Sequence, residues 1–230
     1  MTPATLEALT AARAAKEPVV LATWLGSGKS RLLGEGDLVD GEALADACRA
    51  SLRDDKPQII ETPEGEVFLN PFNPPLRMAI LGAVHIAQPL AAMATLAGYA
   101  VTVIDPRTAF ASAARFPGVA LVHDWPDEAM TAFKPDRRSA VVALTHDPKL
   151  DDPALDVVLK SESFYIAALG SRKTHAGRLE RLKARGHSDA VLARIKGPAG
   201  LSIGAKSPAE IAISILAEAT ATLRQTAGQT

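Results

Sequence analysis

Gly170, Ser171, Arg172 and Lys173 are the residues of this chain best suited to hold a phosphate. They follow an apolar segment and open a helical pattern, and a glycine and a hydroxyl at a helix start offer hydrogen bonds to an anion. The helix dipole disfavours cations in that first turn, so their presence predicts a compensating anion. The alternative is a solvated basic helix face that continues with Arg178, Arg181 and Lys183.

Thr145, His146 and Asp147 directly follow another apolar segment, at residues 139–144. Ligands of open parallel sheets bind at the carboxyl ends of strands, which is where these side chains are expected. His146 can exchange a proton near neutral pH, and Asp147 can orient it or bind a cation. The alternative is that Asp147 only caps the helix that follows.

Two further features belong to neighbouring elements. Lys206 precedes the last helix and adds another candidate cation for the same ligand. Asp151 and Asp152 are interpreted as an exposed helix start.

The segment Leu76–Ala87 predicts a strand, a turn at Gly82 and the start of a helix. This is the context of a Rossmann dinucleotide-binding loop, in which glycine permits the tight turn and a small residue lets helix and strand pack closely. Ala83 and His85 lie at the predicted helix start, where backbone amides receive a phosphate.

Two positions determine which ligand that loop would accept. Asp105 ends the next strand, where a carboxylate accepts a hydrogen bond from a ribose hydroxyl. Val84 stands where the fingerprint has its second glycine, and a β-branched side chain there is expected to hinder the approach of a pyrophosphate. The loop thus favours the fold more strongly than a bound dinucleotide; in the simplest alternative Gly82 only makes the turn.

Three other features of the sequence are not expected to form functional sites. Gly26–Ser30 resembles the end of a P-loop, but Thr23 replaces its first glycine and no helix follows, so a glycine hairpin is expected. Cys48, the one cysteine, lies in a predicted helix and is expected to be a small buried residue. The histidines lack metal-ligand spacing, and no metal site and no catalytic residue are predicted.

The composition excludes several classes of protein. A net charge of -1 argues against a nucleic-acid-binding face or a polybasic membrane patch. Residues 78–104 carry no formal charge, but glycines, His85 and Pro89 divide the segment into a strand, a helix and a strand rather than a membrane span. With one cysteine and no visible secretory signal, a cytoplasmic protein is expected.

The candidate site residues lie in a part of the chain, after residue 75, in which predicted strands and helices alternate. Strands are predicted at 76–81, 100–104, 119–122, 139–145 and 163–169, with helices at 86–97, 107–114, 126–133, 151–160, 172–185 and from Pro208 onward. Such alternation indicates an α/β fold, a Rossmann-like and mostly parallel sheet with helices on both faces. The candidate residues follow strand ends, so the predicted site is a crevice at the carboxyl edge.

The first 70 residues have a different pattern, which indicates a small α+β domain. Helices are predicted at 6–16 and 42–53, and strands at 19–24, 58–62 and 66–69. Three prolines fall within residues 71–75, which are expected to link this domain to a C-terminal domain at 76–230.

Four motifs in this order resemble the XdhC/CoxI family, accessory factors of xanthine dehydrogenase and related molybdenum hydroxylases. They are Gly82–Ala87, Thr145–Asp147, Gly170–Lys173 and Gly200–Ala212, and the resemblance covers about residues 76–222. It implies a small N-terminal domain and a Rossmann-like domain that binds the molybdenum cofactor (molybdopterin) as cargo. It also implies support of cofactor sulfuration and delivery to an apo-hydroxylase of the xanthine dehydrogenase or carbon monoxide dehydrogenase type.

The resemblance further implies a homodimer and a cysteine desulfurase as a second partner. The family's loop maps to Gly82 and His85 and its acidic strand end to Asp105. Its later motifs map to His146, Asp147, Ser171, Arg172 and Lys173.

The chain departs from the family at two places. Val84 replaces a glycine, and the stretch Gly34–Gly41 lacks the cysteine of the Ser-Gly-Gly-Cys segment that longer members carry. The role of that cysteine does not transfer to Cys48, so direct handling of sulfur by this chain is not expected.

Two rival functions stay open. One is an NAD(P)-dependent oxidoreductase, with Asp105 selecting the ribose and His146 acting as acid or base. The other is a ligand-free interaction protein of the same fold, which a blocked crevice at Val84 would favour.

Overall fold

The structure is a computed structural model that describes residues 1–39 and 41–226. Asp40, part of the Gly34–Gly41 stretch, lies outside the described residues, as do residues 227–230 at the end of the expected C-terminal domain. The described residues form two compact units, Met1–Pro74 and Pro75–Thr226. Each is considered by itself.

The N-terminal unit is an antiparallel sheet with strand order β2-β1-β4-β3. Its strands are β1 (Val19–Trp24), β2 (Ser30–Leu33), β3 (Gln58–Thr62) and β4 (Gly65–Phe72), and its helices are α1 (Pro3–Ala15), the short 3-10 helix η1 (Glu35–Asp37) and α2 (Ala43–Asp54). Alternate residues of the strands, Val20, Ala22, Val67 and Leu69, pack with Cys48 of α2 in one apolar cluster. The hairpin expected at Gly26–Ser30 is confirmed, because β1 and β2 pair antiparallel on either side of it.

Strand β4 runs further than expected, since Pro71 and Phe72 belong to it rather than to a linker. Pro71 pairs with Val20 of β1, whereas β3 pairs with β4 only as far as Leu69. Beyond Leu69 no described strand pairs with β4 on the β3 side, and a residue without an N–H is tolerated there.

The C-terminal unit is a six-stranded parallel sheet with strand order β10-β9-β8-β5-β6-β7. Its strands are β5 (Arg77–Leu81), β6 (Ala100–Ile104), β7 (Ala120–Val122), β8 (Ser139–Ala143), β9 (Tyr165–Ala168) and β10 (Ile195–Lys196). Its helices are α3 (Ala87–Leu96), α4 (Pro126–Phe133), α5 (Pro148–Leu159), α6 (Arg172–Ala184), α7 (Asp189–Leu192) and α8 (Pro208–Thr226). This order is that of a Rossmann sheet, whose switch point lies between β5 and β8.

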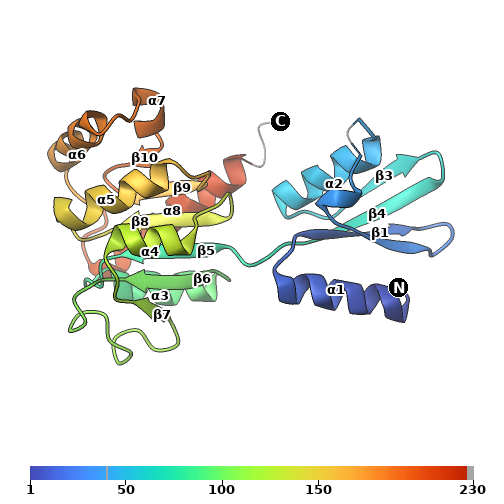
Figure 1. Cartoon of the computed structure of the whole chain (residues 1–230), viewed down its shortest axis with the longest axis horizontal. Coiled ribbons are helices and arrows are strands. Elements are labelled where there is room, and N and C mark those ends of the chain that lie inside the picture. Colours follow the sequence, from blue (N-terminus) through green and yellow to red (C-terminus); the bar gives the residue numbers. More distant parts are fainter. Residues whose placement is uncertain (40, 227–230) are drawn as a thin grey trace. The chain divides into compact units, whose positions relative to one another are not determined.

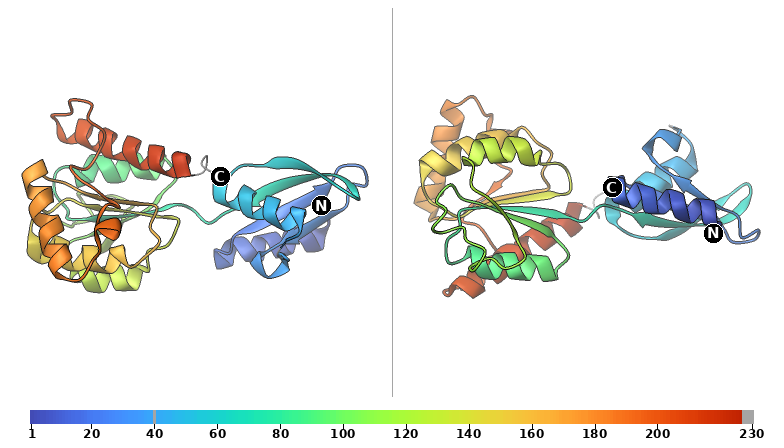
Figure 2. Two further views of the ribbon diagram at one scale, coloured as in Figure 1. Left: turned by 90° about the horizontal axis from the view of Figure 1, so that it is seen from above. Right: turned by 60° about the horizontal axis from the view of Figure 1, so that its bottom comes forward.

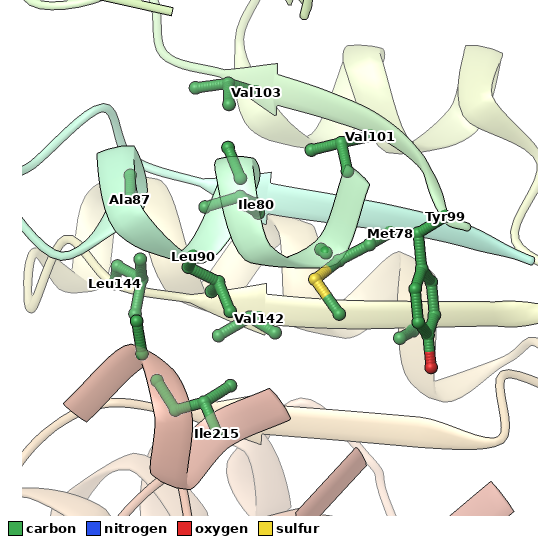
Figure 3. Packing of buried hydrophobic residues seen from close by; sticks show 14 of the residues in the cluster. Met78, Ile80, Ala87, Leu90, Tyr99, Val101, Val103, Val142, Leu144 and Ile215 are labelled. Carbon is green, nitrogen blue, oxygen red and sulfur yellow. The ribbon is translucent and has the colours of Figure 1, made fainter. Parts of the chain in front are cut away.

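Helices cover both faces of this sheet, as the sequence predicts (Figures 1 and 2). On one face, Met78 and Ile80 of β5 pack against Leu90 of α3 and Ile215 of α8, all fully buried (Figure 3). On the other face, Ala79 and Leu81 join the cluster formed with α4, α5 and α6. The strands are apolar throughout because both faces are covered.

The helix predicted at 107–114 is wrong, because these residues form a series of turns. Their alanine-rich sequence favours a helix. Side-chain bonds override that preference: Arg107 pairs with Asp105 two residues before it, and Arg115 donates to the carbonyl oxygens of Ala83 and Phe110.

The last helix begins as predicted. The amide of Ser207 donates to Glu210 Oε2 at 2.8 Å, and the amide of Glu210 donates back to Ser207 Oγ at 3.3 Å. This is the expected capping box.

Candidate functional site at the carboxyl edge of the sheet

Three neighbouring strands end in residues with a left-handed backbone. Gly82 after β5, His146 after β8 and Gly170 after β9 have φ angles of 102°, 61° and 139°. His146 is the one without the freedom of glycine, and a left-handed backbone at such a residue is uncommon and mildly strained. Residues held in this way concentrate at functional sites, which makes the His146 turn the natural centre of a candidate site.

The three turns are in direct contact. A methyl group built on Gly82 would lie 2.5 Å from Thr145 Cγ2, so only glycine lets these two strand ends approach. A methyl group on Gly170 would lie 3.7 Å from His146 Nδ1 and 3.1 Å from Thr174. The structure therefore brings Gly82, Thr145, His146 and Gly170 together, as predicted from strands ending at one edge.

The hydroxyl of Thr145 stabilises the His146 turn through two hydrogen bonds. Its Oγ1 donates to Asp151 Oδ1 at 2.5 Å and accepts from the amide of Asp147 at 3.2 Å. Asp147 in turn accepts from the amide of Lys149 at 2.9 Å, so it is the N-cap of α5. The capping role that the sequence left as an alternative for Asp147 is confirmed.

Helix α6 begins at this edge with two exposed cations. Ser171 caps the helix by accepting from the amide of Thr174 at 3.1 Å. The side chains of Arg172 and Lys173 are exposed and make no ion pair or hydrogen bond with the residues that the structure describes. Lys206, in the loop before α8, has an equally unengaged side chain, and no described contact joins it to the other candidates.

The rest of α6 is only in part a solvated basic face, because Arg181 and Lys183 are exposed whereas Arg178 is buried. Arg178 and Asp151 are both 1% exposed, with Arg178 Nη2 lying 3.5 Å from Asp151 Oδ2. Arg181 donates to both carboxylate oxygens of Asp152, which is 2% exposed. The interpretation of the two aspartates as an exposed helix start is therefore wrong, since they face α6.

The buried pair of Asp151 and Arg178 does not satisfy all the hydrogen-bonding groups of its two side chains. Burial raises the pKa of Asp151, although Thr145, Arg178 and His146 act in the opposite direction. Arg178 Nη2 also donates to the carbonyl oxygen of Leu169 at 3.1 Å, while its Nε and Nη1 lack a partner among the described residues. Sequence reasoning missed this pair, because an Asp at a helix start gives no sign that it is buried.

The roles expected of Ala83 and Asp105 are not available in this geometry. Asp105 is completely buried, and its Oδ2 accepts from the amide of Ala83 and from Arg107 Nη2, both at 2.8 Å. Its Oδ1 accepts from the amide and from Nε of Arg107, at 3.0 and 2.8 Å. Neither the Ala83 amide for a phosphate nor the Asp105 carboxylate for a ribose is left over, and both residues instead hold the Gly82 turn.

Helix α3 begins at Ala87, one residue after its predicted start at 86, so Ala83 and His85 precede the helix. Val84 is half-buried against the apolar cluster under α3. The expectation that this side chain hinders a ligand is thus weakened. His85 is exposed beside it.

Cys48 is completely buried, and burial raises its pKa to about 11. A thiol in that state is not an effective nucleophile or metal ligand at neutral pH. In residues 1–39 and 41–226 no three or more His, Cys, Asp or Glu side chains are arranged to hold a metal ion. None of the helices within these ranges has the length and apolar character needed to cross a membrane.

The fold and these contacts define a class, namely a Rossmann-type domain with a candidate anion site at the carboxyl edge of its sheet. At that edge, exposed cations without partners among the described residues lie beside the His146 turn. A family model described as the XdhC Rossmann domain matches residues 78–219, so the chain belongs to the XdhC family. The resemblance drawn from the four motifs is confirmed.

Two curated relatives agree with this assignment. A protein of Bacillus subtilis, named as a probable subunit of xanthine dehydrogenase, is 31% identical over 162 residues, which cover 70% of this chain and 47% of that protein. "Molybdenum cofactor insertion chaperone PaoD" of Escherichia coli is 31% identical over 147 residues, 64% of this chain and 40% of PaoD. The matched part thus spans less than half the length of either relative.

The crystal structure of a xanthine dehydrogenase from Bacillus halodurans shares the fold over both units. It superimposes with a TM-score of 0.72 at 25% identity, and the match covers 96% of this chain and 64% of that one.

Proposed function

We propose that this chain binds the molybdenum cofactor as cargo and assists its insertion into a molybdenum hydroxylase of the xanthine dehydrogenase class. The observation that carries the proposal is the pair Arg172 and Lys173, exposed and without described partners in the first turn of α6, next to the His146 turn. Cations at a helix start are unfavourable without an anion, and the phosphate of a pterin cofactor is such an anion.

The cofactor would lie along the carboxyl edge, with its phosphate at Ser171, Arg172 and Lys173. His146 would face the pterin or the metal end. The names of the relatives support this class of cargo, because PaoD is described as an insertion chaperone for it.

In this proposal the chain holds the cofactor while a separate enzyme supplies sulfur. Cys48 is the one cysteine, and its burial and raised pKa remove it as a sulfur carrier. A cysteine desulfurase is therefore the expected second partner if sulfuration occurs on this protein. A homodimer, which the family resemblance implies, and a cytoplasmic location, which the single cysteine favours, complete the proposal.

The oxidoreductase alternative is less well supported. It needs Asp105 as a ribose acceptor, and both oxygens of that carboxylate already accept hydrogen bonds from Ala83 and Arg107. The ligand-free alternative rests on Val84 and on the missing cysteine motif, and the partial packing of the Val84 side chain into the core weakens the first of these arguments.

The test is an anaerobic titration of the purified chain with molybdenum cofactor released from a molybdenum hydroxylase, followed by tryptophan fluorescence. We expect saturable binding at or below tens of micromolar, and faster recovery of activity when an apo-hydroxylase receives the loaded protein. Arg172→Gln with Lys173→Gln should weaken binding, whereas Arg137→Gln, which removes an exposed arginine at the opposite edge, should not. Absence of saturation for the unmodified chain would refute the proposal.

A further inference from the structure

Arg107 occupies the position at which a Rossmann sheet recognises the first nucleotide of a ligand. It lies two residues after Asp105, in the turn that follows β6 (Ala100–Ile104), the neighbour of β5. In such sheets the residue at this strand end contacts the ribose or its phosphate.

What the β6 end presents here is a cation and not a carboxylate. Asp105 is completely buried, while the Arg107 side chain is 43% exposed. A guanidinium has only donors and a carboxylate only acceptors, so the exchange changes the class of ligand group that fits from a hydroxyl to an anion.

The guanidinium is held in place before any ligand arrives. Nε and Nη2 make a two-pronged contact with Asp105, both at 2.8 Å, and the Phe110 ring lies 4.7 Å from Cζ. Nη1 makes no hydrogen bond with the residues described by the structure. An arginine fixed in this way loses little conformational entropy on binding, and a free edge with strong donors remains.

A second arginine of the same loop shows what a purely structural role looks like. Arg115 Nη1 donates to the carbonyl oxygens of Ala83, at 2.8 Å, and Phe110, and its Nη2 donates to Gln88. Arg115 therefore fixes the carbonyl of Ala83, as Asp105 fixes its amide. Arg107 stabilises Asp105, but its Nη1 makes no hydrogen bond with any residue in the described part of the chain.

We propose that Arg107 is a phosphate-binding residue of this edge, forming a subsite separate from that at α6. β6 and β9 are three strand spacings apart, about 14 Å, so one free phosphate cannot contact both positions. The proposal extends the proposed function by adding a second point of phosphate recognition. The phosphoryl group belongs either to the nucleotide part of a dinucleotide form of the pterin cofactor or to a free nucleotide.

The experiment compares the full chain with Arg107→Gln and Arg107→Lys by calorimetric titration with ADP, inorganic pyrophosphate and molybdenum cofactor, and with adenosine as the uncharged probe. Arg137→Gln is the matched control, because Arg137 is an exposed arginine at the amino edge of β8. We expect Arg107→Gln to lose about ten- to a hundredfold in affinity for a phosphate-bearing probe. Arg107→Lys should recover part of the loss, and Arg137→Gln should lose nothing.

The probes separate the two sources of phosphate. A loss confined to molybdenum cofactor supports a phosphate in a nucleotide part of the cofactor, and a loss with ADP or pyrophosphate supports a free nucleotide. Equal affinities of Arg107→Gln and Arg137→Gln for every phosphate probe overturn the inference, as does equal loss for adenosine and ADP, since that reports only a distorted loop.

The inference can fail while the proposed function stands, if cofactor binds equally well to both variants. Conversely, ADP binding that needs Arg107, without any cofactor binding, supports the inference and refutes the proposed function. If Arg107→Gln does not fold, Asp105→Asn with Arg107→Gln removes the buried charge together with its partner and serves in its place.

Discussion

The two edges of the C-terminal sheet use their cations in opposite ways. At the amino edge, Arg77 donates to the carbonyl oxygens of Phe133 and Lys134 at the end of α4. Arg194 donates to the carbonyl oxygens of Leu159, Ser161 and Ser163 at and after the end of α5. At the carboxyl edge, Arg172 and Lys173 make no contact of this kind with described residues.

The direction of the helices explains the difference. Crossover helices return towards the amino edge, so their free carbonyl groups gather there and accept hydrogen bonds from arginine. Their free amides gather at the carboxyl edge, where a cation in the first turn of a helix finds no free helix carbonyl and opposes the dipole. A cation at the amino edge therefore serves stability, whereas one in the first turn of a helix at the carboxyl edge calls for a ligand.

Arg178 is the strongest challenge to this division, because it lies beneath the carboxyl edge yet is buried against Asp151. Arg178→Met should lower the free energy of unfolding by about 3–5 kcal/mol, since Asp151 is left buried without its cation. Urea unfolding measures the loss.

The double variant Asp151→Asn with Arg178→Met is the control, because it removes both charges and keeps an acceptor for Thr145. It should recover most of the stability. A double variant as unstable as Arg178→Met would mean that the guanidinium acts through its bond to the Leu169 carbonyl.

Arg77 tests the amino edge. Arg77→Met should cost about 2 kcal/mol of unfolding free energy, because the carbonyl groups of Phe133 and Lys134 and the hydroxyl of Ser139 lose a charged donor. Binding of molybdenum cofactor should be unchanged when measured well below the unfolding transition. If Arg77→Met lost binding without losing stability, an amino-edge cation would serve the ligand, which contradicts the proposed difference between the two edges.

The sequence predicted the sheet and the edge well, because both depend on local patterns. Apolar strands, glycine turns and the capping box before α8 are each recognisable within a few residues. The convergence of Gly82, Thr145, His146 and Gly170 follows from the topology, since parallel strands end at one edge.

The partners of charged side chains were not predictable in the same way. Asp105 was expected to face a ligand and Asp151 to face water, but both are buried against arginines. A carboxylate at a strand or helix end looks the same in a sequence whether it faces a ligand or an arginine. The helix predicted at 107–114 failed for the same reason, because its propensity was outweighed by the bonds of Arg107 to Asp105 and of Arg115 to Ala83.

Arg172 and Lys173 give the smallest but most diagnostic effect. Arg172→Gln with Lys173→Gln removes two cations that oppose the dipole of α6 and have no described partner, so stability should rise by about 0.5 kcal/mol. Affinity for a phosphate-bearing probe should fall in the same variant. Urea unfolding and calorimetric titration with pyrophosphate measure the two changes on one preparation.

Opposite signs of the two effects are the signature of a site, because residues selected for folding do not weaken the fold that they belong to. If the double variant instead loses both unfolding free energy and phosphate affinity, Arg172 and Lys173 are structural donors like Arg77 and Arg194. Lys160→Gln provides the scale for an ordinary surface cation, since Lys160 pairs with Asp156 at 2.8 Å and its loss should cost a few tenths of a kcal/mol at most.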